Sequence, residues 1–475
     1  MARGTRCIPW LLGLAAAAAQ AQTVDCGSGF ESPPLALRFE RKADTAPALA
    51  ALTGVPERPD PLAPWSAQLD RALQDNPALQ AAGRNLLAAD QDLAEVRGGR
   101  LPQLSLSGGL QAVRSAADGA SESTPARASV GLSVSAPLFD GGRLDQLEAW
   151  RNLLRDAAAL AREDARENLV LDTVLNGLER ERHALQALVF GRYEVQMTCL
   201  SQSLERIVRE DRGRASELVQ ARKSLNQAQI AREESQARVR QLEIQLRRLL
   251  GGSSPLAYGL GLHLAGAPEP GAGIAFVEQA PLVRQLEAET RAQRAFAQSL
   301  LSQRSSQLYW VASGSNSRAA GGSAGAFNGS SWQAGVSWSK SLDLGRTIDA
   351  AYRAAMARAD AAGMRREQLV AERTARAGEL AEQAGSSWTR ARSYAQVLRD
   401  SDQVRRNTLQ LWSLLGRRSL FDVMAAESEH YALRAAFVNA VFDALQAQAQ
   451  QLALGARLGD WARAACHGPG AAPCP

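Results

Sequence analysis

Residues that could catalyse a reaction or bind a metal are few and widely separated in this sequence. The four histidines, His183, His263, His430 and His467, have no metal-ligand spacing. No nucleophile is accompanied by a recognisable base, and Gly259-Leu260-Gly261 lacks the third glycine of a nucleotide-binding loop. We therefore predict that the protein is not an enzyme and has no cofactor or metal site.

The N-terminus has the form of a secretory signal peptide. Arg3 and Arg6 precede an apolar run from Ile8 to Ala19, and Ala19-Gln20-Ala21 has the small residues of a cleavage site. Export would bring the remaining cysteines into an oxidising compartment, where they could form disulfides. Cys466 and Cys474 are the closest in sequence, but all three pairings stay open among Cys26, Cys199, Cys466 and Cys474.

The overall composition excludes some classes of partner. The net charge of +5 over 475 residues is mild, so it indicates neither nucleic-acid binding nor a polybasic membrane anchor. Aromatic residues make up only 5%, while Ala, Arg, Gln, Leu and Glu dominate, which is typical of long helices.

Two kinds of element alternate along the chain and would position any functional residue. Residues 128–138 alternate apolar with small polar side chains, which predicts a β-strand with two different faces. The following run to Leu250 contains no proline after Pro137 and has apolar residues at seven-residue spacing, which predicts long helices packed as coiled coils. Pro77 is expected to break or kink a helix that starts near Trp65.

This layout occurs twice, at a nearly constant offset of 204 residues. For example, Arg100 corresponds to Arg304, and Asp145 corresponds to Asp349. We predict a signal peptide at 1–21, an extended and partly mobile segment at 22–64, a first repeat at 65–250 with strands 102–113 and 128–138, a junction at 251–273, a second repeat at 274–459 with strands 307–315 and 331–342, and a tail at 460–475.

The four predicted strands suit the wall of a membrane β-barrel. Each has about ten residues, with one apolar face and one face rich in Ser and Gly. Trp310, Trp332 and Trp338 are predicted to form an aromatic belt at the membrane interface. Four strands cannot close a barrel, whereas a trimer would provide twelve strands and a lumen. A soluble hairpin with one buried face is the alternative.

Two glycine-containing interruptions divide the long helical regions. Gly213 with Ser216 in the first repeat, and Gly416 with Ser419 in the second, predict helix-turn-helix tips. Glycine favours a helix C-terminus, and serine can cap the start of the next helix. Helices of about 65 residues extend about 100 Å, so we expect the tips far from the strands.

Three motifs, in this duplicated order, carry a family resemblance. They are Asn76-Pro77-Ala78-Leu79, the strand end Pro137-Leu138-Phe139-Asp140-Gly141-Gly142-Arg143, and the tip from Gly416 to Met424. With them, residues 65–460 resemble TolC-like outer-membrane efflux proteins. The resemblance implies an α+β membrane protein: a homotrimer whose twelve-stranded β-barrel lies in outer-membrane lipid and continues as an α-helical periplasmic tunnel.

The resemblance also implies where the tunnel is gated. Asp422 falls at the position of a ring of aspartates in the tunnel entrance, and Arg418 falls at that of a tip arginine involved in closure. Glu217 of the first repeat lies at the position opposite Asp422. A second ring position is occupied by Ala425, and the position of a tip tyrosine is occupied by Ser413, so the contacts that hold the gate closed would differ here.

The residues themselves allow a second interpretation of Asp422. It follows Ser419 by three positions, the spacing of a capping box, so it could serve only to start a helix. Three carboxylates gathered at a constriction would instead repel one another and attract cations.

The implied activity is passive export. A long N-terminal segment and a divergent tip favour a type I secretion system, in which an inner-membrane ABC transporter and a periplasmic membrane-fusion adaptor deliver an exported polypeptide. A polypeptide of the RTX-toxin type is implied only by the overall resemblance of the chain to one member of this family. The outer-membrane channel of a multidrug or metal efflux pump is the alternative use. Alternatives of other classes are a trimeric coiled-coil surface adhesin and a soluble periplasmic scaffold.

Overall fold

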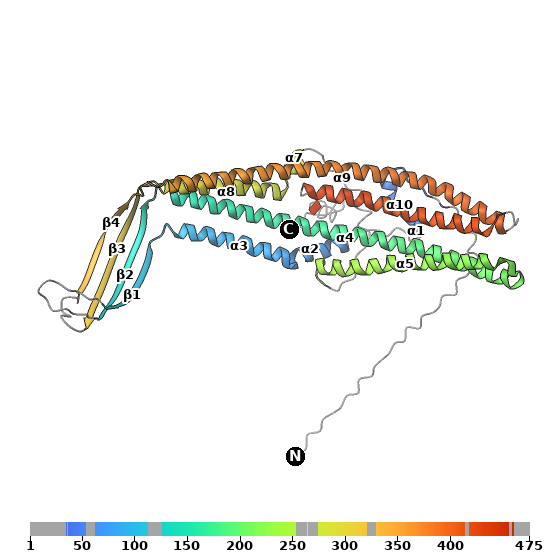
Figure 1. Ribbon diagram of the computed structural model, residues 1–475, viewed down its shortest axis with the longest axis horizontal. Helices are drawn as coiled ribbons and strands as arrows, with labels where there is room; N and C mark the ends of the chain where they lie inside the picture. The colour runs from blue at the N-terminus through green and yellow to red at the C-terminus, as the bar shows by residue number, and fades with distance from the viewer. Residues whose placement is uncertain are drawn as a thin grey trace, which may run out of the picture.

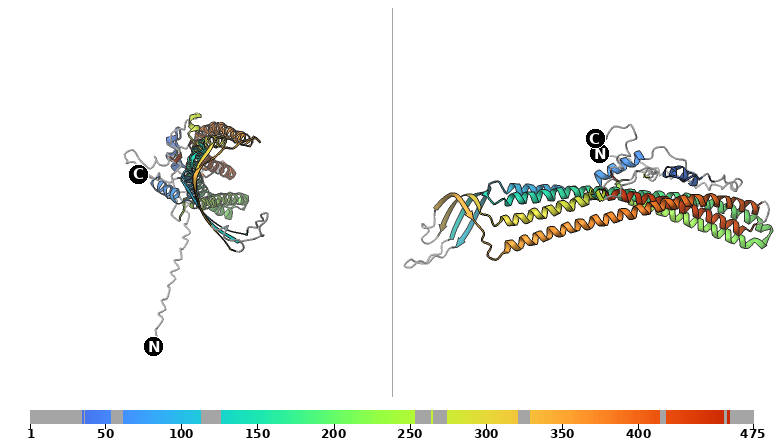
Figure 2. Two further views of the ribbon diagram at one scale, coloured as in Figure 1. Left: turned by 90° about the vertical axis from the view of Figure 1, so that its left-hand side faces the viewer. Right: turned by 90° about the horizontal axis from the view of Figure 1, so that it is seen from above.

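The chain forms a long, narrow molecule with a β-sheet at one end and two helix tips at the other (Figures 1 and 2). The computed structural model describes residues 35, 37–53, 62–112, 126–252, 264, 274–320, 329–413, 418–455 and 458–459. The predicted signal peptide, the C-terminal tail and most of the 251–273 junction lie outside these residues.

The described elements follow one another in the order expected for two similar halves. The strands are β1 (Gln103–Ala112), β2 (Ala126–Phe139), β3 (Gln307–Ala320) and β4 (Gly329–Ser339). The helices are η1 (Lys42–Asp44), α1 (Thr45–Thr53), α2 (Leu62–Asp75), α3 (Pro77–Gly98), α4 (Arg143–Glu210), η2 (Arg212–Arg214), α5 (Ala215–Leu250), α7 (Ile274–Glu278), α8 (Pro281–Ser302), α9 (Thr347–Ser413) and α10 (Leu420–Leu454).

The sheet is antiparallel, in the order β1-β2-β3-β4. Directly paired residues share a face, so the register defines two surfaces. The apolar face carries Leu104, Leu106, Leu110, Val130, Leu132, Trp310, Trp332, Val336 and Trp338, all exposed in the single chain. The other face is dominated by serines, with Oγ–Oγ contacts of 2.6 Å between Ser105 and Ser133 and 2.9 Å between Ser315 and Ser331.

One strand extends further than the sequence predicts. Residues 316–320 were expected in a loop, but they continue β3 because β2 is long enough to pair with them through Ala126. At the opposite end, a β-bulge between Pro137 and Phe139 marks the exit of the chain from the sheet.

The turn from β2 into α4 requires its glycines. Asp140 accepts hydrogen bonds from the Gly142 and Leu144 amides at 3.1 and 2.7 Å, which caps α4. Gly141 and Gly142 have φ angles of 65° and 79°, a region that favours glycine. A Cβ on Gly141 would lie 2.2 Å from Cβ of Ser305, so this turn also packs closely on the turn between α8 and β3.

Two pairs of residues that are separated by the same sequence offset make the same kind of contact. Arg100 contacts Asp145 at 2.6 Å, and Arg304 contacts Asp349 at 2.6 Å. In the second half, Asp343 caps α9 through the amides of Thr347 and Ile348. Each strand pair is therefore anchored to its long helix by an arginine–carboxylate pair.

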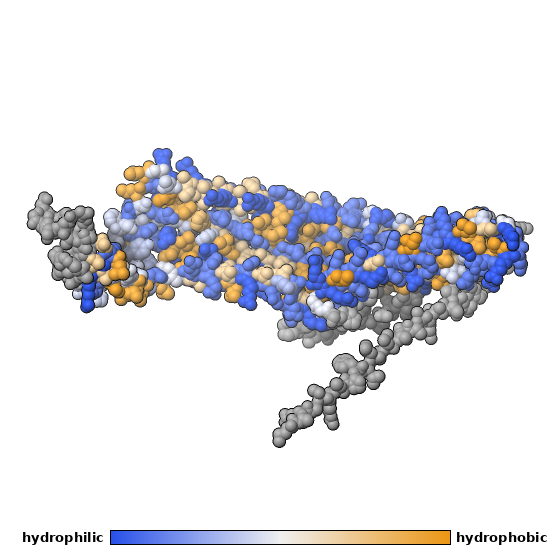
Figure 3. All heavy atoms as spheres, turned by 60° about the horizontal axis from the view of Figure 1, so that its bottom comes forward, coloured by the Kyte–Doolittle hydropathy of each residue, from blue (hydrophilic) through white to orange (hydrophobic). Residues whose placement is uncertain are grey.

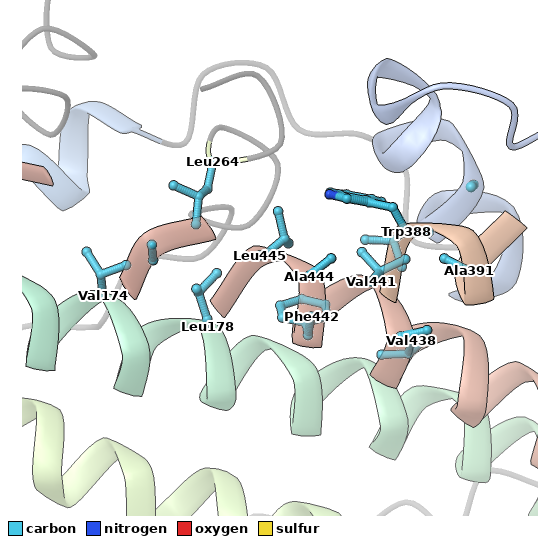
Figure 4. Close-up of a cluster of buried hydrophobic side chains, with 14 of the residues drawn as sticks. Val174, Leu178, Leu264, Trp388, Ala391, Val438, Val441, Phe442, Ala444 and Leu445 are labelled. Carbon is cyan, nitrogen blue, oxygen red and sulfur yellow. The ribbon is translucent and has the colours of Figure 1, made fainter. Parts of the chain in front are cut away.

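Helices pack along the length of the molecule as two antiparallel hairpins, α4 with α5 and α9 with α10. The main hydrophobic cluster lies where α4, α9 and α10 meet, and includes Leu178, Trp388 and Phe442 (Figure 4). No helix among the described residues is long and apolar enough to cross a membrane. Large hydrophobic side chains are exposed on the sheet, which lies at the left end of Figure 3, and smaller hydrophobic patches lie along the helices.

The segment before α2 differs from the extended, partly mobile chain that its prolines predict. Residue 35 and residues 37–53, here called the N-terminal strap, include η1 and α1. Leu37, Phe39, Ala48 and Leu52 are buried in the main cluster. The apolar residues of Ala46–Thr53 outweigh the single Pro47, which lies in the first turn of α1, where a proline is tolerated.

Candidate functional site: the helix tips and the strap

The first tip is a short 3-10 turn between α4 and α5. Asp211 accepts a hydrogen bond from the Gly213 amide at 2.9 Å, which forms the turn. Ser216 was predicted to cap α5, and this prediction is wrong: α5 begins at Ala215, so Ser216 already lies within the helix. The spacing of Asp211 and Gly213 was the sequence signal for this turn. It places the capping side chain at Asp211, about one helical turn before Ser216.

The second tip ends in a complete capping box. The Ser419 hydroxyl accepts from the Asp422 amide at 3.2 Å, and the Asp422 carboxylate accepts from the Ser419 amide at 3.2 Å. The guanidinium of Arg418 lies 3.8 Å from the same carboxylate oxygen. Gly416 lies outside the described residues. Asp422 therefore has a capping role, which uses its Oδ2 and does not need its Oδ1.

Both tips belong to one hydrophobic cluster. Leu218 of α5 packs in the same cluster as Leu420 and Val423 of α10 and Trp412 of α9. Glu217 is half-buried, and its Oε2 is shielded from solvent with no hydrogen-bond partner. Within the described chain, no hydrogen bond or ion pair joins Glu217 to the second tip.

A buried polar cluster, which the sequence did not reveal, lies on the tip side of the main hydrophobic cluster. Arg405 of α9 bridges Asp402 at 3.1 Å and Glu427 of α10 at 3.3 Å, and all three side chains are nearly inaccessible. Arg434 donates to Nε2 of His430 at 2.8 Å. Asp402 and Arg405 are three residues apart, and His430 and Arg434 are four apart. This spacing did not indicate burial, because it is also common on solvent-facing helices.

Burial and charge set the protonation of this cluster. Burial, together with Arg434 and Arg405, lowers the pKa of His430 to about 3, so this imidazole is neutral and accepts the hydrogen bond from Arg434. Burial also raises the pKa of Glu427. For Asp402, burial acts upward, but the Leu35 amide and Arg405 lower the pKa overall.

The N-terminal strap binds to this cluster and spans both halves of the chain. Its Leu35 amide donates to Asp402 at 3.0 Å. Its Leu52 carbonyl accepts from Arg434 of α10 at 3.2 Å and from Arg192 of α4 at 3.4 Å. Phe39 stacks on Trp388 and meets Phe437 edge-on, with ring centroids 6.1 and 5.2 Å apart.

The two hairpins also meet directly through a polar seam between α4 and α10. The residues of this seam lie on successive turns of the two antiparallel helices, so their side chains can form hydrogen bonds across the interface. The contacts, each of 2.6 Å, join Arg182 to Asp443, Gln186 to Asn439, and Glu179 to Gln446.

Cys199 is disulfide-bonded. Every other cysteine lies outside the described residues, so the partner of Cys199 does too. Cys466 and Cys474, the two cysteines closest in sequence, are among these. No group of three or more His, Cys, Asp or Glu side chains in the described part of the chain is arranged to hold a metal.

The predicted aromatic residues all lie on the apolar face of the sheet. Trp338 pairs with Leu308 near the helices, and Trp332 pairs with Gly314 nearer the loop end. Trp332 is 81% exposed, although its ring covers Gly314 closely enough that a Cβ there would lie 2.7 Å away. Trp310 pairs with Val336, between these two levels.

The family described as outer membrane efflux protein has a model that matches residues 68–252 of this chain. This match confirms the predicted localisation in the outer membrane of a Gram-negative bacterium, and it supports the resemblance to TolC-like proteins. It also agrees with the prediction that the protein is not an enzyme. No curated protein matches the chain.

Solved outer-membrane channels have the same fold. A CusC structure described by its transmembrane channel formation has a TM-score of 0.72 at 16% identity, covering 83% of this chain and 91% of that one. The outer membrane protein VceC of Vibrio cholerae has a TM-score of 0.67 at 15% identity, covering 83% of this chain and 95% of that one. The open state of the Neisseria gonorrhoeae MtrE outer membrane channel has a TM-score of 0.68 at 17% identity, covering 83% of this chain and 90% of that one.

Proposed function

We propose that this chain is one subunit of a homotrimeric outer-membrane exit duct. The observation that carries the proposal is the sheet: it has an exposed apolar face and a serine face, and it leads directly into two helices of 68 and 67 residues. Within the described chain β1 and β4 each pair on one side only. Open edges are not tolerated in lipid, so pairing β4 of one subunit with β1 of the next would close a twelve-stranded barrel.

The helices supply the rest of the duct. At 1.5 Å per residue, α4 and α9 extend about 100 Å from the sheet, far more than a bilayer. Three such subunits would enclose a periplasmic tunnel with the helix tips at its distal end. A surface adhesin is less well supported, because strands occur in both halves of this chain rather than in one segment.

The protein inserted into planar bilayers tests this function. We expect a trimer with stable conductance. A monomer, or a trimer without conductance, would contradict the proposal.

Of the two uses, we propose type I secretion. The support is the long N-terminal segment and the tip that departs from the family pattern at Ser413 and Ala425. We propose CyaE, the outer-membrane component for export of an RTX-type adenylate cyclase toxin, as its counterpart. The substrate would be a polypeptide of that type, delivered by an ABC transporter and a membrane-fusion adaptor. Deleting the gene should leave a secreted polypeptide inside the cell. Unchanged secretion with increased drug or metal sensitivity would favour the efflux alternative.

We further propose that Asp422 forms a ring at the distal entrance, with Arg418 as its ion-pair partner and Glu217 on the adjoining hairpin. The capping box and the ring are compatible roles, and two variants separate them. Asp422→Asn keeps an oxygen acceptor for the cap but removes the charge, and Ser419→Ala weakens the cap but keeps the charge.

We expect Asp422→Asn to lose cation preference in bilayers and Ser419→Ala to retain it. Equal cation preference in Asp422→Asn and the unmodified protein would leave Asp422 with the capping role alone.

A further inference from the structure

Charged residues are nearly absent from the sheet. The 10, 14, 14 and 11 residues of the four strands include only two charged side chains, Arg127 in β2 and Arg318 in β3. Both lie at the loop end of the sheet, away from the helices, because Arg127 pairs with Ala319 and Arg318 pairs with Ala128. Adjacent pairs in the ladder point to opposite faces, so the two arginines lie on different sides of the sheet.

Arg127 lies on the serine face. Its pairing partner in β1 is Gln111, and its Nη2 donates to Ser317 Oγ at 3.1 Å. Its Nε is shielded from solvent and has no hydrogen-bond partner, and no ion pair neutralises this guanidinium within the described chain. Arg318 lies on the apolar face and is exposed.

The serine face is the sheltered side of β2. Residues 127, 129, 131 and 133 are half-buried, whereas 126, 128, 130 and 132 are exposed. This difference is expected if the sheet curves towards the serine face. In the closed barrel of the proposed function, on which this inference rests, that face lines the lumen and the apolar face meets lipid.

We infer that Arg127 is a selectivity residue of the barrel lumen. Three copies would form a basic ring near the loop end of a wall whose other strand side chains on this face are uncharged and mostly serine. Rings of arginine favour anions in pores, and no other strand residue offers a competing charge on this face. The ring would attract anionic solutes and acidic stretches of a polypeptide at the loop end of the barrel.

The test is block of bilayer conductance by inositol hexakisphosphate added on the barrel side of the full-length trimer. Arg127→Gln removes the ring, and Arg318→Gln removes the same charge from the opposite face at almost the same level. We expect the half-blocking concentration to rise about tenfold in Arg127→Gln and to stay unchanged in Arg318→Gln and in Arg127→Lys.

The outcomes separate the inference from the function beneath it. Conductance with unchanged block in Arg127→Gln, or an equal change in Arg318→Gln, overturns the role of Arg127 and leaves the duct standing. Absence of conductance in the unmodified protein overturns the duct, and the ring with it.

Discussion

His430 is neutral in the folded protein and would be charged in the unfolded chain at mildly acid pH. Its folded pKa of about 3 lies below the ordinary value of 6.5. Between these values the unfolded state binds a proton that the folded state does not, so the free energy of unfolding falls as pH falls. The neutral imidazole is also the acceptor for Arg434, and a proton on Nε2 would remove that hydrogen bond.

We therefore predict that acidification from pH 6.5 to 5 destabilises the protein through His430 by about 2 kcal/mol. His430→Gln has no such proton to bind, so its stability should depend less on pH over this interval. Thermal unfolding of the two proteins in the same detergent at each pH measures the difference. Parallel pH profiles would mean that His430 does not carry this dependence.

Cys199 allows a second prediction at the level of one side chain. In protein denatured without reductant, the Cys199 peptide should remain unmodified by iodoacetamide, because its sulfur is in a disulfide. Reduction before alkylation should make the same peptide fully reactive. Denaturation removes protection by burial, so labelling without reductant would show that the bond is absent in the isolated protein.

At the scale of elements, the strap adds contacts to both hairpins, beyond those that the hairpins make with each other. Phe39→Ala would leave a cavity between Trp388 and Phe437 and should weaken strap docking by about 3 to 5 kcal/mol. We expect faster amide hydrogen exchange over residues 37–53 than in the unmodified protein. The neighbouring Arg38→Ala, whose side chain is 79% exposed, is the control and should exchange at the original rate.

The sequence predicts the regular elements well and their docking poorly. Long helices and two-faced strands repeat over many residues, so the positions of α4, α9 and β2 follow from periodicity. The strap has one 3-10 turn and one short α-helix, and nothing local indicates that Phe39 contacts Trp388, which is 349 residues away. Likewise, Arg405 and Glu427 carry no sign of burial, because only the packing of α9 on α10 puts them inside.

The tips show the same limit at finer detail. The Ser419 capping box follows from spacing and is present, whereas the start of α5 was misplaced because Asp211, not Ser216, makes the turn. The proposed ring at Asp422 depends on other copies of the chain, which no local pattern describes.

For the whole molecule, contact of the apolar face with lipid predicts a loss of stability on charge substitution that a soluble protein would not show. Leu106 is 75% exposed, so Leu106→Lys should cost little in a single soluble chain. In a barrel wall facing lipid, the same change should cost about 2 to 4 kcal/mol. Ser107→Lys, on the adjacent position and opposite face, would meet water and should be tolerated.

Folding of both variants into lipid vesicles, followed by urea titration, measures this difference. Equal stability of Leu106→Lys and Ser107→Lys would argue that the apolar face does not contact lipid.

The place where the strap holds the long helix also fixes a lever arm. The strap contact nearest the tip is at Asp402, and the 11 residues from there to the end of α9 at Ser413 extend about 17 Å beyond it. A swing of about 10° around that point would displace the helix end by about 3 Å, given the length of the arm. The strap would then act as a fulcrum, so that a partner pressing on the tips could produce a displacement about as wide as a water molecule with only a small rotation at the pivot.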